Sequence, residues 1–157
     1  MLKTKIAVFV SGGGTNFEAL INAQENGKIP HGEIVLMVSS SKTAYALKRA
    51  ENHGIKSVVC SKKELGSQES FEEEILKSLE ENDIQLIVLA GFMSILSKEF
   101  TKKYENRIIN IHPSLIPSFC GEGFYGLHVH EAALKKGVKV TGATVHIVCL
   151  LYTSDAA

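Results

Sequence analysis

The chain has 157 residues, of which 45% are hydrophobic, enough for one domain with a core of its own. Its 17 basic and 17 acidic residues cancel, so no overall field favours nucleic acid or an anionic membrane as a partner. The three cysteines are odd in number and widely spaced, unlike those of a zinc site or a disulfide framework. No stretch reaches transmembrane length, and we expect a soluble protein of the reducing cytoplasm.

Strands and helices are predicted to alternate through the first ninety residues. Apolar, β-branched runs predict buried strands, and apolar residues at helical spacing predict the helices. The predicted strands are 6–10, 33–38, 55–60 and 84–90, and the predicted helices are 17–23, 44–50 and 67–81. We expect Ser41 or Thr43 to cap the second helix, and residues 84–90 to form the most buried strand.

The alternation continues through the rest of the recognisable pattern. Ser97 is predicted to cap a short helix that runs to about Tyr104. After it come, in order, a strand at 108–112, a long glycine-containing connection, a helix at 128–136 and a strand at 139–148. Strands that alternate with helices imply right-handed parallel crossovers. The predicted fold is therefore α/β, with a doubly wound, mainly parallel open sheet.

A glycine-rich loop follows the first strand. Gly14, Thr15 and Asn16 put backbone donors and a hydroxyl at the start of a helix, where the macrodipole favours an anion such as phosphate. The loop matches neither a Walker motif nor a full Gly-x-Gly-x-x-Gly, and on its own it fits a tight turn as well as a phosphate site. If the strand order reverses between the first and fourth strands, this loop shares a crevice with the loops that follow residues 84–90 and 108–112.

The predicted strand that ends at His112 presents two polar side chains on one face. Asn110 and His112 share that face because successive side chains of a strand point to opposite sides. Pro113 has no backbone donor, so the strand stops there. A carboxamide and an imidazole together stabilise a developing oxyanion, which favours acyl transfer, although a structural role for His112 stays open. His128 and His130 would need a third ligand to hold a metal, and we expect none.

Four motifs, in this order, resemble the phosphoribosylglycinamide formyltransferase family. They are Ser11-Gly-Gly-Gly-Thr-Asn16, Leu89-Ala-Gly-Phe-Met-Ser-Ile-Leu96, Asn110-Ile-His-Pro-Ser-Leu-Ile-Pro117 and Thr141-Gly-Ala-Thr-Val-His146. Four motifs in the right order are more specific than any one of them. The resemblance implies a Rossmann-like formyltransferase fold, with a catalytic domain over residues 1–148.

The resemblance also implies an activity and a set of site residues. The activity is transfer of a formyl group from 10-formyltetrahydrofolate to the amine of glycinamide ribonucleotide, in de novo purine biosynthesis and without a metal. Asn110 and His112 are then catalytic, and His146 supports them. The ribonucleotide phosphate is held by Gly14, Thr15 and Asn16. The folate is bound by Gln68, Met93, Ser94, Ile95, Leu96 and Asn110. The partners expected are these two small molecules, with no nucleic acid or membrane, and the assembly expected is a monomer or homodimer.

Two features depart from the family pattern. An Arg that often precedes the acidic helix in the family is replaced here by Gln68, which provides no fixed charge. Residues 149–157 do not resemble the family, whose members continue through a further strand and helix and use an Asp after the His146 strand. We therefore expect a truncated C-terminus with a foreign tail, and impaired activity. Asp155 is expected to be a charged terminal residue rather than a displaced catalytic Asp.

Alternative functions remain. A formyltetrahydrofolate hydrolase shares the catalytic motifs but carries an extra N-terminal domain, whereas the first strand here begins by residue 6. A methionyl-tRNA formyltransferase would need a tRNA-binding extension and a basic surface, which this neutral chain does not offer. From a different class, the chain could be a noncatalytic nucleotide- or folate-binding fragment.

Overall fold

The computed structural model describes residues 2–149, which form two compact units, one up to Ser94 and one from Ile95 onward. None of the helices within residues 2–149 combines the length and apolar character that crossing a membrane requires. The expectations for the tail at 150–157, Asp155 included, lie outside the described residues.

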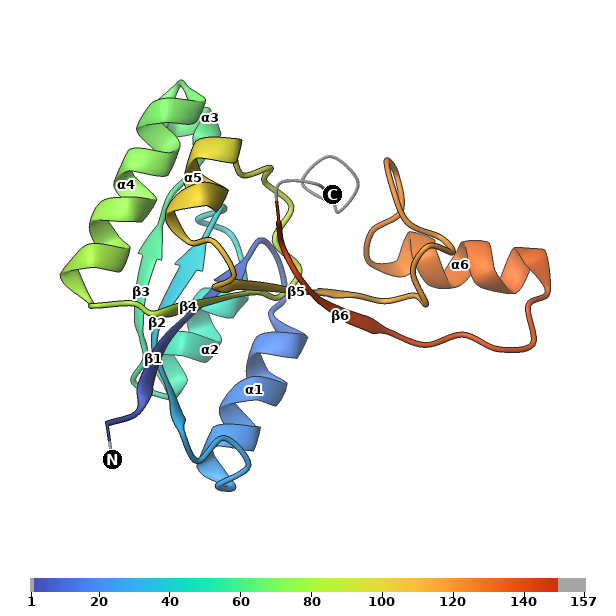
Figure 1. Ribbon diagram of the computed structural model, residues 1–157, viewed down its shortest axis with the longest axis horizontal. Coiled ribbons are helices and arrows are strands. Elements are labelled where there is room, and N and C mark those ends of the chain that lie inside the picture. Colours follow the sequence, from blue (N-terminus) through green and yellow to red (C-terminus); the bar gives the residue numbers. More distant parts are fainter. Residues whose placement is uncertain (1, 150–157) are drawn as a thin grey trace. The chain divides into compact units, whose positions relative to one another are not determined.

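The first unit is a parallel sheet with helices on both faces (Figure 1). Its elements are β1 (Thr4–Val10), α1 (Thr15–Glu25), β2 (Gly32–Ser39), α2 (Ala46–Asn52), β3 (Lys56–Val59), α3 (Lys62–Leu65), α4 (Gln68–Glu81) and β4 (Leu86–Leu89). The strands lie in the order β3-β2-β1-β4, with β1 parallel to both β2 and β4. The predicted α/β class, the doubly wound parallel sheet and the reversal between the first and fourth strands are confirmed.

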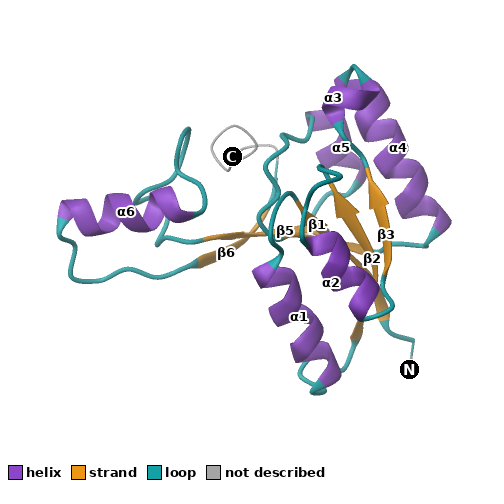
Figure 2. Ribbon diagram, turned by 180° about the vertical axis from the view of Figure 1, so that it is seen from behind, coloured by secondary structure: helices purple, strands orange, loops and turns teal. Residues whose placement is uncertain are grey.

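Alternating side chains of β1 serve two separate helix layers. Helices α1 and α2 lie on one face of the sheet and α4 on the other (Figures 1 and 2). Val8 packs in a cluster with Phe17 of α1 and Ala50 of α2, all of them fully buried. On the opposite face, the rings of Phe9 and Phe92 meet edge-on at 5.1 Å between centroids. A strand that is buried on both faces needs apolar residues at every position, which explains its continuous apolar run.

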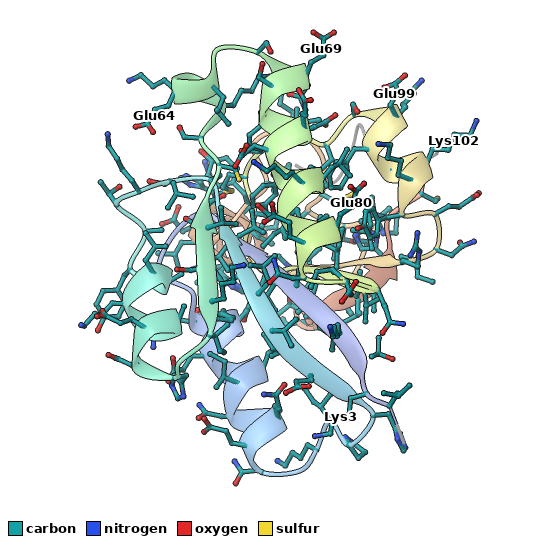
Figure 3. All side chains as sticks on the ribbon, turned by 90° about the vertical axis from the view of Figure 1, so that its left-hand side faces the viewer. Lys3, Glu64, Glu69, Glu80, Glu99 and Lys102 are labelled. Carbon is teal, nitrogen blue, oxygen red and sulfur yellow. The ribbon has the colours of Figure 1, made fainter. Side chains whose placement is uncertain are left out.

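Helix α4 is amphipathic, as its sequence predicts. Ser67 caps it by accepting a hydrogen bond from the backbone N–H of Ser70. Its apolar stripe is buried, and Phe71 stacks on Phe92 at 6.5 Å between centroids. Glu69 and Glu80 are exposed on the helix (Figure 3).

Two predictions for the first unit are wrong. Neither Ser41 nor Thr43 caps the second helix, because the Ser41 hydroxyl accepts the backbone N–H of Thr43 and α2 begins three residues later, at Ala46. Residues 84–90 are not the most buried strand either. Leu86 of β4 is half-buried, whereas Val8 and Phe9 of β1 are completely buried, because β1 is covered by helices on both faces along its apolar run.

The second unit pairs two strands in antiparallel fashion. Its elements are α5 (Lys98–Lys103), β5 (Ile108–His112), α6 (Leu127–Lys136) and β6 (Thr144–Ile147). Ser97 caps α5 by accepting the backbone N–H of Phe100, as predicted. The antiparallel pairing of β5 and β6 corrects the expectation that each crossover joins parallel strands, and it agrees with a sheet that is mainly parallel.

Strand β6 is shorter than predicted. It covers Thr144–Ile147 instead of residues 139–148, because β5 ends at His112, opposite Thr144, and Pro113 provides no further donor. Before the strand, a Cβ at Gly142 would lie 2.8 Å from a side-chain carbon of Leu115, so the backbone of Gly142 is packed against that leucine.

Candidate active site

The first part of the site is the loop between β1 and α1, which we call the glycine loop, residues 11–16. Gly14 is the N-cap residue of α1, has a positive φ of 72° and provides no side-chain cap. The backbone N–H groups of the first helical turn are therefore left without a side-chain acceptor from the cap. Thr15 and Asn16 are exposed beside them. This arrangement of donors and a hydroxyl suits an anion.

Helix α2 holds the other side of the glycine loop. The backbone N–H of Ala46 donates to the carbonyl of Gly12 at 3.2 Å, and Nε of Arg49 donates to the carbonyl of Gly13 at 2.8 Å. A Cβ on Gly14 would lie 2.8 Å from Cβ of Ala46, so the close approach of α2 requires glycine there. Arg49 also pairs with Glu18 of α1, at 3.1 Å. The loop is thus fixed by contacts that lie outside its own motif.

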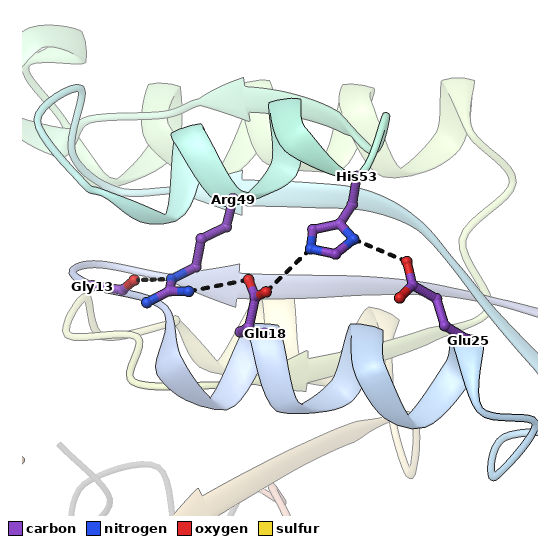
Figure 4. Close-up of polar contacts among 5 residues, drawn as sticks. All are labelled: Gly13, Glu18, Glu25, Arg49 and His53. Carbon is purple, nitrogen blue, oxygen red and sulfur yellow. Dashed lines mark hydrogen bonds and ion pairs between the residues drawn. The ribbon is translucent and has the colours of Figure 1, made fainter.

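Charged side chains continue this contact along α1 and α2 (Figure 4). His53 faces two carboxylates, with Nε2 at 3.1 Å from Glu18 and Nδ1 at 2.9 Å from Glu25. The hydrogen bonds to Glu25 and Glu18 raise the pKa of His53. The hydrogen bonds from His53 and Arg49 lower the pKa of Glu18. Both shifts favour an imidazolium at His53 beside the ionised carboxylate of Glu18.

Ser11 joins the glycine loop to the loop that follows β4. Its hydroxyl oxygen accepts the backbone N–H of Met93 at 2.7 Å and lies 2.6 Å from the hydroxyl of Ser40. The backbone N–H of Ser11 donates to the carbonyl of Gly91 at 3.0 Å. The predicted phosphate loop and the first residues of the predicted folate loop are therefore neighbours, as the strand reversal beside β1 requires.

The predicted folate residues differ in exposure. In the first unit, Met93 is exposed and Ser94 is half-buried, while Gln68 donates from its side-chain amide to Glu72 of the same helix at 2.6 Å. In the second unit, Ile95 is exposed, but Leu96 is only 6% exposed and belongs to the core. Met93 and Ile95 thus have apolar side chains available for a ligand, whereas that of Leu96 is used for packing.

The catalytic candidates lie in the second unit, on the buried face of β5. Asn110 and His112 are 8% and 6% exposed, and the residues between and beside them are more open, so the predicted shared face is confirmed. Asn110 lies opposite His146 in the β5–β6 register, and Nδ2 of Asn110 is 3.1 Å from Nε2 of His146. The antiparallel pairing of β5 with β6 brings these two residues together.

His112 has a different partner. Its Nε2 lies 2.8 Å from the backbone carbonyl of Phe119, which accepts a hydrogen bond, so Nε2 carries the proton. The hydroxyl of Ser114, which is fully buried, donates to the carbonyl of Ser118. The connection between β5 and α6 is therefore folded back onto the end of β5, and His112 is in contact with it.

Thr144 of β6 fixes the beginning of the same connection. Its hydroxyl donates to the carbonyl of Ser114 at 2.6 Å and accepts the backbone N–H of Ile116 at 3.0 Å.

Within residues 2–149, no three His, Cys, Asp or Glu side chains come together to hold a metal ion. His128 is exposed on α6, with Nδ1 at 3.5 Å from Glu131.

Several contacts around the candidate site were not predicted from the sequence. Arg49, Glu18 and His53 follow no local motif, and their meeting depends on how α1 packs beside α2. Thr144 lies inside one of the four motifs, two residues before His146. That position in the motif was the sequence signal from which its contact with Ser114 could have been found.

Comparisons with known proteins agree on one family. A family model described as Formyl transferase matches residues 4–149. The trifunctional purine biosynthetic protein adenosine-3 of Gallus gallus is 47% identical over 146 residues, which cover 93% of this chain and 14% of that protein. The chain thus spans a small part of that relative.

Solved structures match over a larger share of their length. Phosphoribosylglycinamide formyltransferase from Brucella melitensis is 41% identical, with a TM-score of 0.86, and the match covers 99% of this chain and 78% of that one. The enzyme of the same name from Coxiella burnetii is 40% identical, with a TM-score of 0.85, and the match covers 94% and 67%. The chain therefore belongs to the formyl transferase family, and its predicted resemblance to phosphoribosylglycinamide formyltransferase is confirmed.

Proposed function

We propose that the chain transfers a formyl group from 10-formyltetrahydrofolate to the amine of glycinamide ribonucleotide, a step of de novo purine biosynthesis. The observation that carries the proposal is the buried amide of Asn110 in β5, with Nδ2 held 3.1 Å from Nε2 of His146. Family membership supports a folate-derived formyl donor. The named relatives support glycinamide ribonucleotide as the acceptor.

The amide of Asn110 is suited to stabilise a developing negative charge. A carboxamide has two N–H donors, and when Nε2 of His146 accepts one of them the other is left for a ligand. The amine of the acceptor attacks the formyl carbon, and charge then grows on the formyl oxygen. A donor fixed beforehand by its neighbour stabilises that charge without reorganising during the reaction.

His112 is proposed as the second donor. Because its Nε2 donates to the carbonyl of Phe119, the other ring nitrogen, Nδ1, is the atom left for the reaction. Nδ1 donates when the imidazole is protonated and accepts when it is neutral. The contact with Phe119 thus fixes the ring orientation and assigns each nitrogen a separate task.

The remaining residues are proposed to bind the two substrates. Gly14, Thr15 and Asn16 hold the ribonucleotide phosphate at the N-terminus of α1, an assignment supported by the uncapped first turn. The folate is bound by Gln68, Met93, Ser94, Ile95, Leu96 and Asn110. Holding both substrates makes the reaction effectively intramolecular, which contributes about 7–11 kcal/mol in well-oriented cases.

We also propose that residues 1–148 form the catalytic domain, that the protein is a monomer or homodimer, and that it works in the cytoplasm. The compartment is supported by three free thiols, Cys60, Cys120 and Cys149, which a reducing environment maintains.

A transfer assay combined with calorimetry tests the function. Purified chain is incubated with both substrates, and formylated ribonucleotide and free formate are measured separately. Formylated product that depends on both substrates supports the proposal. Formate released without the ribonucleotide would instead indicate a hydrolase, and calorimetric binding of both ligands without turnover would indicate a noncatalytic binding module.

The phosphate assignment has its own variant. Thr15→Val keeps the shape of the side chain and removes its hydroxyl, so we expect ribonucleotide affinity to fall about tenfold while folate affinity is unchanged. Equal loss of both affinities would argue against a phosphate contact by Thr15.

A further inference from the structure

We propose that Arg49 is a positioning residue that aims the backbone donors of the glycine loop at the ribonucleotide phosphate. The inference rests on the proposed function, because it names the residue that orders the backbone of the proposed phosphate site. Arg49 lies on α2, outside the glycine loop, and its Nε donates to the carbonyl of Gly13 at 2.8 Å (Figure 4).

The argument begins with the geometry of a peptide unit. In a planar trans peptide, the C=O of one residue and the N–H of the next point in opposite directions. A carbonyl that is held on one side therefore sends the following N–H to the other side. Because Arg49 holds the carbonyl of Gly13, the N–H of Gly14 points away from α2.

The preceding peptide is held in the same way. The backbone N–H of Ala46 donates to the carbonyl of Gly12 at 3.2 Å, so the N–H of Gly13 also points away from α2. Two successive N–H groups are thus directed to the same side, which is the arrangement that binds phosphate oxygens. Gly12 and Gly13 have no Cβ and open space around them, so without these two bonds their peptides would rotate easily.

Arg49 is itself held firmly enough to act in this way. Its guanidinium pairs with Glu18 at 3.1 Å and lies over the ring of Tyr45, 5.1 Å from the ring centroid. Its side chain is 24% exposed. A planar guanidinium fixed by a carboxylate and a ring directs its Nε to one place, which a flexible lysine ammonium does not do.

The experiment compares ligands with and without the phosphate. Calorimetry measures the affinities of glycinamide ribonucleotide and of its dephosphorylated riboside for four proteins. They are the wild-type chain, Arg49→Met, Glu18→Gln and Lys48→Met. Lys48 is the neighbouring cation of α2, and its exposed pair with Glu51 does not involve the loop. Lys48→Met therefore removes the same charge as Arg49→Met without touching Gly13.

We expect Arg49→Met to bind the ribonucleotide about tenfold more weakly, the usual effect of losing a hydrogen bond to a charged donor, while riboside and folate affinities stay unchanged. Glu18→Gln leaves Arg49 in place but weakens its anchor, so a smaller loss in the same direction is expected. Lys48→Met should behave as wild type.

Each other outcome is decisive. Suppose that Arg49→Met prefers the ribonucleotide over the riboside as strongly as the wild-type chain does. That result would overturn the inference but would leave the proposed phosphate site in place. Equal losses in Arg49→Met and Lys48→Met would mean that net charge is responsible, and would overturn it too. Equal binding of ribonucleotide and riboside by the wild-type chain would overturn the phosphate site itself, and the inference with it.

Discussion

Nδ2 of Asn110 and Nε2 of His146 lie 3.1 Å apart because the antiparallel register of β5 and β6 places the two residues opposite each other. An amide that is held by one donor presents its second donor in a fixed direction. His146 is therefore expected to act through Asn110, and the two should affect turnover as a unit.

Replacing Asn110 by Ala should lower turnover much more than binding. Removing one oxyanion donor typically costs about 10²–10³ in rate, whereas substrate contacts elsewhere remain. The measurement is kcat in the formyl-transfer assay beside calorimetric affinities for both substrates. Turnover within a few fold of wild type would remove Asn110 from the mechanism.

His146→Phe should lower turnover by about tenfold, because Asn110 stays but loses its partner. The decisive comparison is the double variant with Asn110→Ala, which should be no slower than Asn110→Ala alone. Losses that simply multiply would show that the two residues act independently.

Gly14→Ala should destabilise the first unit by about 2 kcal/mol or more. The positive φ of 72° disfavours a side chain, and the added Cβ would lie 2.8 Å from Cβ of Ala46. Gly13→Ala is the matched control, since its Cβ has nothing within 4 Å, and it should cost within about 0.5 kcal/mol. Urea denaturation of both variants measures the free energies of unfolding, and equal values would contradict the close packing of α2 on the loop.

Thr144→Val should cost about 2 kcal/mol of stability, because the carbonyl of Ser114 and the N–H of Ile116 lose their partner while the side-chain shape is kept. Thr141→Val, at an exposed position of the same segment, is the control and should be nearly neutral. Denaturant unfolding followed by circular dichroism checks both, and a neutral Thr144→Val would mean that water replaces the hydroxyl.

The His53 network should make stability depend on pH. The pKa of His53 is raised above 6.5. The contribution of His53 to folding stability is therefore fully present below pH 6.5 and is lost as pH rises through the folded-state pKa. The pKa of Glu18 is lowered below 4.5, so its contribution is present above 4.5 and is lost as pH falls through the folded-state value. The Tm difference between wild type and His53→Gln should therefore be largest between pH 4.5 and pH 6.5 and should become smaller in alkaline buffer.

His31→Gln removes an exposed histidine of the same unit and serves as the control. A Tm difference for His53→Gln that does not change with pH, or that matches the control throughout, would show that the carboxylates do not hold an imidazolium.

Periodicity and glycine placement were enough to predict the four strands and the three longer helices of the first unit, but not the short helix α3. The continuous apolar run of β1 and the stripe from Phe71 to Leu79 each have one physical solution, burial on two faces for the strand and on one face for the helix. The cap of α2 failed because the Ser41 hydroxyl has a closer backbone partner in its own turn.

The second unit was harder to predict because its limits are set by pairing. The sequence of residues 139–148 does not indicate that β6 runs antiparallel to β5 or that it begins at Thr144, since both depend on its pairing with β5. The partners of the site residues were equally hidden. Alternation predicts that Asn110 and His112 share a face, but it does not predict that one meets His146 and the other the carbonyl of Phe119.

The contact of α2 with the glycine loop has a consequence for protein engineering. A designer who transplants Ser11–Asn16 into another strand–helix junction moves the glycines but leaves Ala46 and Arg49 behind, and the grafted peptides would be free to turn. The portable unit is instead the whole β1–α1–β2–α2 segment, residues 4–52, in which the sequence that shapes the loop travels with it.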